Sequence, residues 1–145
     1  EAHEKLEQVR DLLWEQRRAL GIEYFPDYLT AYHAPMENMI LLVEKLTPAT
    51  LTQAKIDELQ QEAGAAQELW RQVEQFPFER QHYQLSETKA SALQQDIVRE
   101  SEALENLLAA LANGDRANIL KAVPALKPPL AEAYMLFGDF PPTQK

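Results

Sequence analysis

The sequence predicts an all-α protein, and within that class an antiparallel four-helix-type bundle with proline-kinked second and last helical segments. Ala, Leu, Glu and Gln are abundant and only 4 glycines are present, a composition that favours helices over strands. Apolar residues recur three and four positions apart along most of the chain, which is the period of one helix face. The connections between the periodic segments are short, as is typical of antiparallel bundles.

The length of the chain, 145 residues, is typical of a single domain. We therefore expect one helical-bundle domain over residues 1–140. Residues 141–145 read PPTQK and have no apolar periodicity. They are expected to form a flexible tail.

The first helical segment is marked by an apolar stripe. Leu6, Val9, Leu13 and Leu20 recur at helical spacing. Gly21 follows them directly, and glycine is the residue most often found just after a helix end. The pattern predicts a helix that ends at this glycine.

Prolines shape the second segment. Pro26 and Pro35 each fit best in the first turn of a helix, where the missing N–H has no intrahelical partner in any case. We therefore expect a short helix over about residues 26–33, a break or kink at Pro35, and a second helical run up to Leu46.

Thr52 is the expected N-cap of the most regular segment. The apolar residues that follow it alternate spacings of three and four without a miss: Ile56, Leu59, Ala63, Ala66, Trp70 and Val73. This pattern predicts a helix with one face buried along its length. The helix is expected to end before Pro77, and residues 77–85 are expected to form a connecting loop.

Ser86 is the expected N-cap of the next helix. Its apolar stripe is Leu93, Ile97, Leu104, Leu108 and Leu111, with Ser101 as the polar exception. The helix is expected to close at residues 113–115, which read NGD.

The last segment begins at Asp115 and is interrupted by prolines. These are Pro124, Pro128 and Pro129. Because proline lacks an N–H and restricts the residue before it, one uninterrupted helix is not expected. We expect a helix to about Val123, a kink or short break, and a further helix over about residues 129–137.

Charge and composition exclude several classes of function. The net charge of −9 repels phosphate backbones and anionic lipid head groups, so nucleic-acid binding is not expected. No cysteine is present, which excludes disulfides, thiolate nucleophiles and thiolate-held metals. The longest apolar runs, such as residues 39–43, are far shorter than the roughly 20 residues that span a bilayer. Membrane insertion is therefore not expected.

Three residues of the second segment form a candidate metal site. His33, Met36 and Met39 lie three positions apart, and imidazole and thioether groups are ligands that suit Cu(I). The alternative, which the pattern favours, is that both methionines belong to the stripe that packs this helix. Pro35 also predicts a helix boundary between the histidine and the sulfur atoms.

Three tyrosines in the same region form a candidate ligand or partner site. Tyr24, Tyr28 and Tyr32 recur every four residues. Such a stripe can line a pocket for a flat ligand or present an amphipathic surface to a partner. It is also consistent with a helix edge packed over the end of the bundle, with its hydroxyl groups in water.

Two segments and the expected architecture resemble the haem-binding four-helix bundles of the cytochrome c-prime type. The segments are LEQVRDLLWEQRRALG, residues 6–21, and VPALKPPLAEAYMLFGDF, residues 123–140. That family attaches haem near the end of its last helix through a Cys-x-x-Cys-His motif. Here residues 131–137 read AEAYMLF, with neither cysteine nor histidine. The resemblance therefore implies a bundle fold and a periplasmic setting, but no covalent haem and no inherited ligand residue.

Two functional hypotheses follow. In the first, the chain is a non-catalytic bundle, without a cofactor, that binds a partner or small ligand through its tyrosine-rich region, residues 22–36. The apolar run ILLV, residues 40–43, is a candidate surface for a homodimer. In the second, the chain carries copper or noncovalent haem, using His33 with Met36, Met39 or Met135. An enzyme is not expected, because the chain has no nucleophile elbow, phosphate-binding glycine loop or zinc-binding helix motif.

Overall fold

The structure is a computed structural model that describes residues 2–138, without the side chain of His3. Its elements, in chain order, are α1 (Ala2–Ala19), α2 (Phe25–Val43), α3 (Gln53–Gln75), the 3₁₀ turn η1 (Arg80–Tyr83), α4 (Glu87–Asn113), α5 (Arg116–Ala122), the 3₁₀ turn η2 (Pro124–Leu126) and α6 (Lys127–Met135). No strand occurs among these residues, and the predicted all-α class is confirmed. The tail at 141–145 lies outside the described residues.

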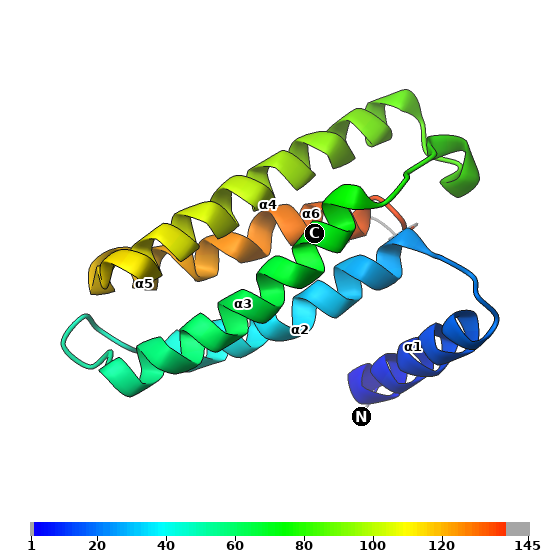
Figure 1. The fold of residues 1–145 in the computed structure, drawn as a ribbon. Helices are drawn as coiled ribbons and strands as arrows, with labels where there is room; N and C mark the ends of the chain where they lie inside the picture. Colours follow the sequence, from blue (N-terminus) through cyan, green and yellow to red (C-terminus); the bar gives the residue numbers. More distant parts are fainter. Residues whose placement is uncertain (1, 139–145) are drawn as a thin grey trace, which may run out of the picture.

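The helices α2 to α6 pack around one apolar core (Figure 1). The helix α2 packs against α3, α3 against α4, and α4 against α5 and α6. Contacts between α2 and α6 close the ring. The segments α5, η2 and α6 follow one another along α4, so the last part of the chain acts as a single interrupted rod (Figure 1).

The helix α3 confirms the most regular sequence pattern. All six residues of the predicted stripe are buried. The N-cap is Thr52, whose hydroxyl accepts a hydrogen bond from the Lys55 N–H at 3.3 Å. Ser86 caps α4 in the same way, accepting from the Lys89 N–H at 3.1 Å. Both caps satisfy a helix-terminal N–H that has no intrahelical partner.

The predicted break at Pro35 is wrong, because α2 runs without interruption from Phe25 to Val43. A proline inside a helix loses one backbone hydrogen bond and costs roughly 3 kcal/mol. Pro35 is itself buried, and Met36 and Met39 beside it are 1% and 0% exposed. Burial of each large apolar side chain contributes roughly 1.5–3 kcal/mol, so a continuous packed helix outweighs the lost hydrogen bond.

The interruption expected near Pro124 is present. The helix α5 ends at Ala122, and the turn η2 begins at this proline. The following helix starts at Lys127, two residues earlier than expected, because Pro128 and Pro129 fit within its first turn.

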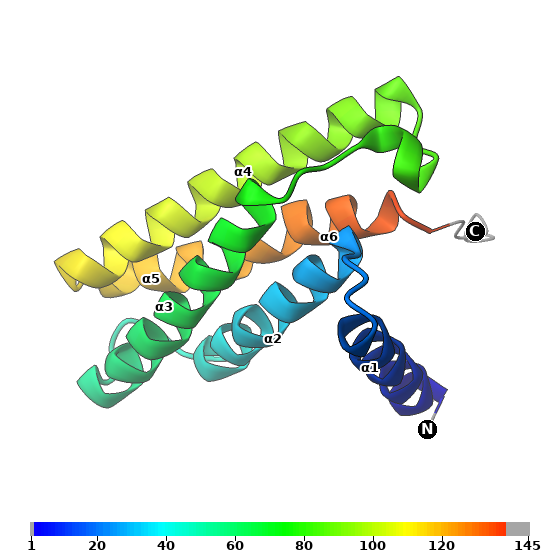
Figure 2. The same ribbon diagram turned by 45° about the vertical axis from the view of Figure 1, so that its right-hand side comes forward.

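The helix α1 lies outside the core. It projects away from the other helices at the start of α2 in both ribbon views (Figures 1 and 2). Gly21, with φ of +68°, ends it in the left-handed conformation that glycine adopts without strain. The structure therefore places residues 6–21, the segment that resembles the first helix of a cytochrome c-prime bundle, beside the core rather than in it.

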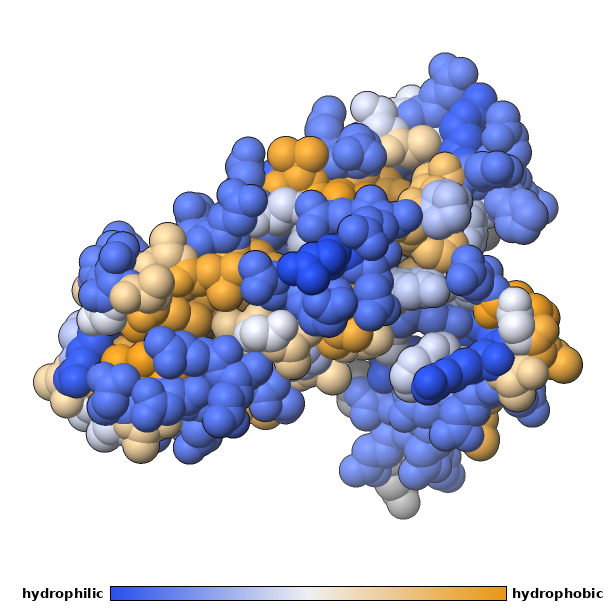
Figure 3. Space-filling view, viewed as in Figure 1, coloured by the Kyte–Doolittle hydropathy of each residue, from blue (hydrophilic) through white to orange (hydrophobic). Residues whose placement is uncertain are grey.

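Most large apolar side chains that stay exposed belong to α1 and the segment after it. Among the described residues these side chains are Leu6, Val9, Leu12, Leu13, Trp14, Leu20 and Ile22, against Leu41, Val98 and Met135 elsewhere. Figure 3 shows hydrophobic side chains at the surface of this part of the molecule, at the right of the view. An apolar stripe without a packing partner is the most unusual feature of the fold.

Candidate functional site

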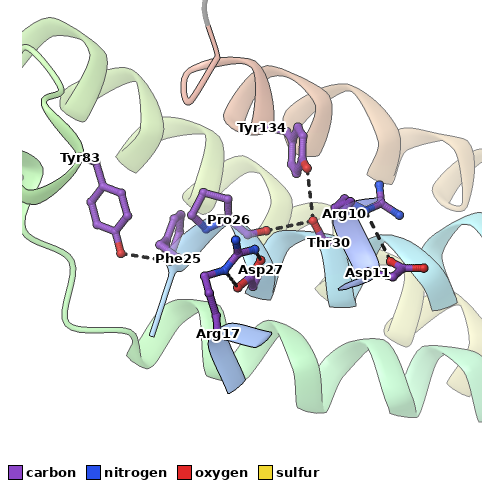
Figure 4. Close-up of polar contacts among 9 residues, drawn as sticks. All are labelled: Arg10, Asp11, Arg17, Phe25, Pro26, Asp27, Thr30, Tyr83 and Tyr134. Carbon is purple, nitrogen blue, oxygen red and sulfur yellow. Dashed lines mark hydrogen bonds and ion pairs between the residues drawn. The ribbon is translucent and has the colours of Figure 1, made fainter. Parts of the chain in front are cut away.

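The junction of α1 and α2 is held by a charged pair. The Arg17 guanidinium donates two hydrogen bonds to the Asp27 carboxylate, one of them from Nε to Oδ2 at 2.8 Å (Figure 4). The same guanidinium carbon lies 4.7 Å from the centre of the Tyr24 ring. Asp27 lies in the first turn of α2, where the helix dipole favours a negative charge. The bond to Asp27 raises the pKa of Arg17, so the guanidinium keeps its positive charge.

Replacing Arg17 by alanine is expected to loosen α1 while leaving the core intact. Asp27 would keep its buried position, at 9% exposure, without its cation. The Arg17 side chain is 24% exposed, so water weakens the pair, and a double-mutant cycle with Asp27→Asn should give a coupling of about 1 kcal/mol. Amide hydrogen exchange should accelerate in α1 only. Arg18→Ala is the control, and equal acceleration in that variant would contradict the role of the pair.

The first of two grooves at this junction lies between α1, α2 and α3. It has a volume of about 520 Å³. Trp14 and Ile22 line it from the side of α1, and Tyr24, Tyr28 and Leu69 line it from the core. Burial raises the pKa of both tyrosines, so their hydroxyls remain protonated donors. The groove combines apolar walls with hydroxyl groups, as binding sites commonly do.

The second groove lies between α1 and the neighbouring ends of α2 and α6. It has a volume of about 330 Å³. Leu6, Val9 and Leu13 of α1 form one wall, and Pro26 and Phe137 belong to the other. The two grooves share Tyr24 and Asp27, so together they flank the line along which α1 is attached.

Thr30 fixes the floor of the second groove. Its hydroxyl lies 3.0 Å from the Pro26 carbonyl oxygen, to which it donates, and 3.3 Å from the Tyr134 hydroxyl (Figure 4). These contacts connect the first two turns of α2 to the last turn of α6. The wall opposite α1 is therefore built from two elements that hold each other in place.

An aromatic cluster makes the start of α2 rigid. The Phe25 ring is buried, and its centre lies 5.2 Å from the ring centres of Phe76 and Phe78 and 5.5 Å from that of Phe137. Its backbone N–H donates to the Tyr83 hydroxyl at 3.0 Å (Figure 4). Aromatic pairs at these separations stabilise beyond their buried area. The packing of Phe25 thus fixes the positions of its neighbours Tyr24 and Asp27.

Basic and acidic side chains lie on different faces of α1. With 100° between successive residues, Arg10 and Arg17 fall along one edge of the apolar stripe and Lys5 along the other. The carboxylates of the described helix nearest the opposite face are those of Glu4, Asp11 and Glu15. The stripe of α1 is therefore bordered by Arg10 on one side and Lys5 on the other, while Arg17 is paired with Asp27 and Arg10 Nε lies 3.8 Å from Asp11 Oδ1 (Figure 4).

The three tyrosines that the sequence groups together divide into two environments. Tyr24 and Tyr28 are half-buried and line the first groove. Tyr32 is fully buried, and its hydroxyl donates to Glu100 Oε1 at 2.6 Å. The surface therefore includes the first two tyrosines, and the third belongs to the core.

The candidate metal ligands are also separated. His33 has a side chain that is 46% exposed, and its Nε2 lies 3.8 Å from Glu37 Oε2. Met36 and Met39 are buried in the core, while Met135 on α6 is 57% exposed. Because α2 does not break at Pro35, the exposed imidazole and the two buried sulfur atoms belong to one continuous helix. Within residues 2–138, no three His, Asp or Glu side chains gather as a metal site requires.

The core contains a polar network that the sequence pattern did not reveal. Glu100 is 0% exposed and lies on the buried face of α4, whereas Ser101, the expected polar exception, is half-buried. The Ser101 hydroxyl accepts a hydrogen bond from Trp70 Nε1 at 2.9 Å. Burial raises the pKa of Glu100 to about 7, and the hydrogen bond from Tyr32 opposes this rise. The burial of Glu100 could have been predicted from its spacing, because it lies seven residues after Leu93 and therefore on the same helix face as the apolar stripe.

The chain matches no family model, no curated protein and no solved structure. Among residues 2–138, no helix is both long and apolar enough to cross a membrane. The function is therefore inferred from the arrangement of the protein's own residues.

Proposed function

We propose that the protein is a non-catalytic binding protein that holds an amphipathic helix of a partner protein on the surface formed by α1, the start of α2 and the end of α6. The observation that carries the proposal is the exposed apolar stripe of α1. Leu6 and Val9 are 69% and 53% exposed, although they belong to the regular apolar stripe of a helix. An amphipathic helix needs a surface against which to bury such a stripe, and a contiguous exposed patch is typical of an interaction site.

The partner chemistry follows from the charges at the edges of the stripe. Arg10 and Lys5, on opposite edges of the stripe, favour a helix with an apolar face bordered by carboxylates, whereas Arg17 is already paired with Asp27. Two copies of α1 fit each other less well, because in either orientation the charged residues at both edges are basic. A different, acidic helix is therefore favoured over a second copy of the chain.

The grooves on both sides of the attachment line suit such a helix. Apolar side chains of the partner helix can pack into the groove between Leu13 and Phe137, as in other helix-in-groove complexes. The hydroxyls of Tyr24 and Tyr28 are available as donors in the neighbouring groove. Positive charge around an apolar seam gives orientation and specificity as well as affinity.

The rest of the chain acts as a scaffold in this proposal. We assign α2, α3, α4 and the rod of α5 and α6 to an antiparallel four-helix-type bundle, which fixes the position of the α2 and α6 walls. The resemblance to cytochrome c-prime bundles, and the periplasmic setting that it implies, stay predictions.

Substitution at the stripe is expected to weaken binding of an acidic amphipathic helix. Two synthetic helices with the same apolar face, one bordered by glutamate and one by lysine, serve as probes in fluorescence anisotropy. The glutamate-bordered helix should bind at least tenfold more tightly, and Leu6→Glu should weaken it at least tenfold, a loss of about 1.4 kcal/mol. This variant places a carboxylate in the seam that must become buried.

Leu41→Glu is the matched control, because Leu41 is 60% exposed on α2, away from α1. It should leave the affinity unchanged. Equal binding of both probes, or an equal loss in the Leu41 variant, would contradict the proposal. Sedimentation of the free protein tests the alternative, because self-association lost in the Leu6 variant would assign the stripe to a second copy.

A further inference from the structure

We propose that Glu100 and Tyr32 form a proton-operated latch between α2 and α4. With a proton on Glu100, the pair holds the two helices together in a dry core. When Glu100 loses this proton, water enters at this level and the contact between the helices loosens. The latch lies in the core, and it is independent of the surface proposed to bind a partner.

The geometry of the pair is unusual for two polar side chains. Both residues are 0% exposed, and each comes from a different helix. The phenol donates to Oε1 at 2.6 Å, whereas the second carboxylate oxygen, Oε2, has no hydrogen-bond partner within the described part of the chain. A buried carboxylate with one donor is poorly stabilised as an anion. A proton on the carboxyl group removes this cost by neutralising the charge.

Among the described residues, no ion pair or hydrogen bond joins Glu100 to a cation. From α2 the Tyr32 phenol contacts it, and the Tyr32 ring packs in turn against Trp70 of α3. Charged residues of the packed elements have other partners: Glu74 of α3 accepts from Ser101, Asp96 and Arg99 of α4 pair with each other, Arg99 also pairs with Glu132 of α6, and Glu37 of α2 pairs with Lys127 of α6. Arg99 is already shared between Asp96 and Glu132. Burial and the phenol are accordingly what set the proton affinity of Glu100.

The latch is expected to operate near neutral pH. Burial raises the pKa of Glu100 to about 7, so its charge changes within the range in which proteins function. Because the phenol stabilises the anion, Tyr32→Phe should raise the midpoint of the transition. Glu100→Gln cannot ionise and should abolish it. A shift of the pH midpoint in Tyr32→Phe would show that the phenol acts on the proton of Glu100, which a side chain that only fills space would not do.

The fluorescence of Trp70 can report on the environment of the Glu100–Tyr32 pair. Its ring centre lies 4.7 Å from that of Tyr32, and its Nε1 donates to the hydroxyl of Ser101, the residue after Glu100. The chain has 2 tryptophans, and the other, Trp14, is on α1. Trp14→Phe therefore leaves a single reporter next to the latch.

The test is a pH titration of the full chain carrying Trp14→Phe, with Trp70 emission and acrylamide quenching recorded from pH 5 to pH 9. We expect a red shift and at least a twofold rise in the quenching constant, with a midpoint near pH 7. The midpoint should move upward with Tyr32→Phe and should be unchanged with Asp96→Asn, which controls for the neighbouring carboxylate. Far-UV circular dichroism at pH 5 establishes that each variant is folded.

A flat titration of the parent protein would overturn the latch. So would a transition that persists in folded Glu100→Gln, or one that follows Asp96 rather than Glu100. If the glutamine variant does not fold, the direction of the midpoint shift in Tyr32→Phe decides the matter: an upward shift supports the latch, and an unchanged or lower midpoint overturns it.

Discussion

The free energy of unfolding is expected to fall by about 3 kcal/mol as the pH rises from about 4.5 to about 7, because the folded protein holds a proton on Glu100 that the unfolded chain releases. The pKa of this carboxyl is about 7 in the folded protein, against 4.5 for an unperturbed glutamate. Below the lower value both states are protonated, so the full stability is present. It is lost as the pH rises through the folded value, and no further loss is expected from this residue above it.

Chemical denaturation at a series of pH values measures this dependence. In Glu100→Gln the slope between pH 4.5 and pH 7 should largely disappear, because no proton is released on unfolding at this position. Asp96→Asn is the control, and it should retain the slope over this window. A wild-type protein with constant stability from pH 5 to pH 8 would contradict the account of the buried carboxyl.

Phe25→Ala is expected to cost about 3–5 kcal/mol of folding free energy, the range for a buried aromatic ring replaced by alanine. Phe25 is 1% exposed and touches the rings of Phe76, Phe78 and Phe137. Its removal leaves a cavity at the end of the core on which the first turn of α2 rests. We also expect faster amide exchange in residues 22–30 than in α3, because this turn would lose its fixed base.

Leu41→Ala, on the exposed side of the same helix, is the matched control for this substitution. Its cost should stay within about 0.5 kcal/mol, as for other surface positions. Denaturation curves for both variants give the comparison. Similar costs at the two positions would show that the aromatic cluster does not fix the start of α2.

The regular apolar stripes made much of the fold predictable. Thr52 and Ser86 were identified as caps, and the stripe of α3 was identified residue by residue, because a buried helix face imposes a strict period on the sequence. The wrong prediction, the break at Pro35, arises where local preference and packing compete. Pro35 favours a helix start locally, but its burial together with the methionines of α2 keeps the helix continuous.

The candidate site was only partly predictable for a related reason. The stripe of α1 has the same period as a core helix, so Leu6 and Leu13 do not reveal that they stay exposed. Tyr24 and Tyr28 were singled out by spacing, yet the same spacing includes Tyr32, which is buried. Period alone shows which residues share a face, and tertiary packing decides whether that face meets the core.

We propose that the stripe of α1 and the grooves beside it receive an acidic amphipathic helix. Titration of isotope-labelled protein with the glutamate-bordered helix, followed by two-dimensional NMR, locates the bound helix. We expect amide shifts to concentrate in residues 5–30 and 134–138, and the region around Leu41 to stay unchanged. Shifts centred on Leu41 or spread evenly over the surface, or no shifts at millimolar peptide, would contradict it.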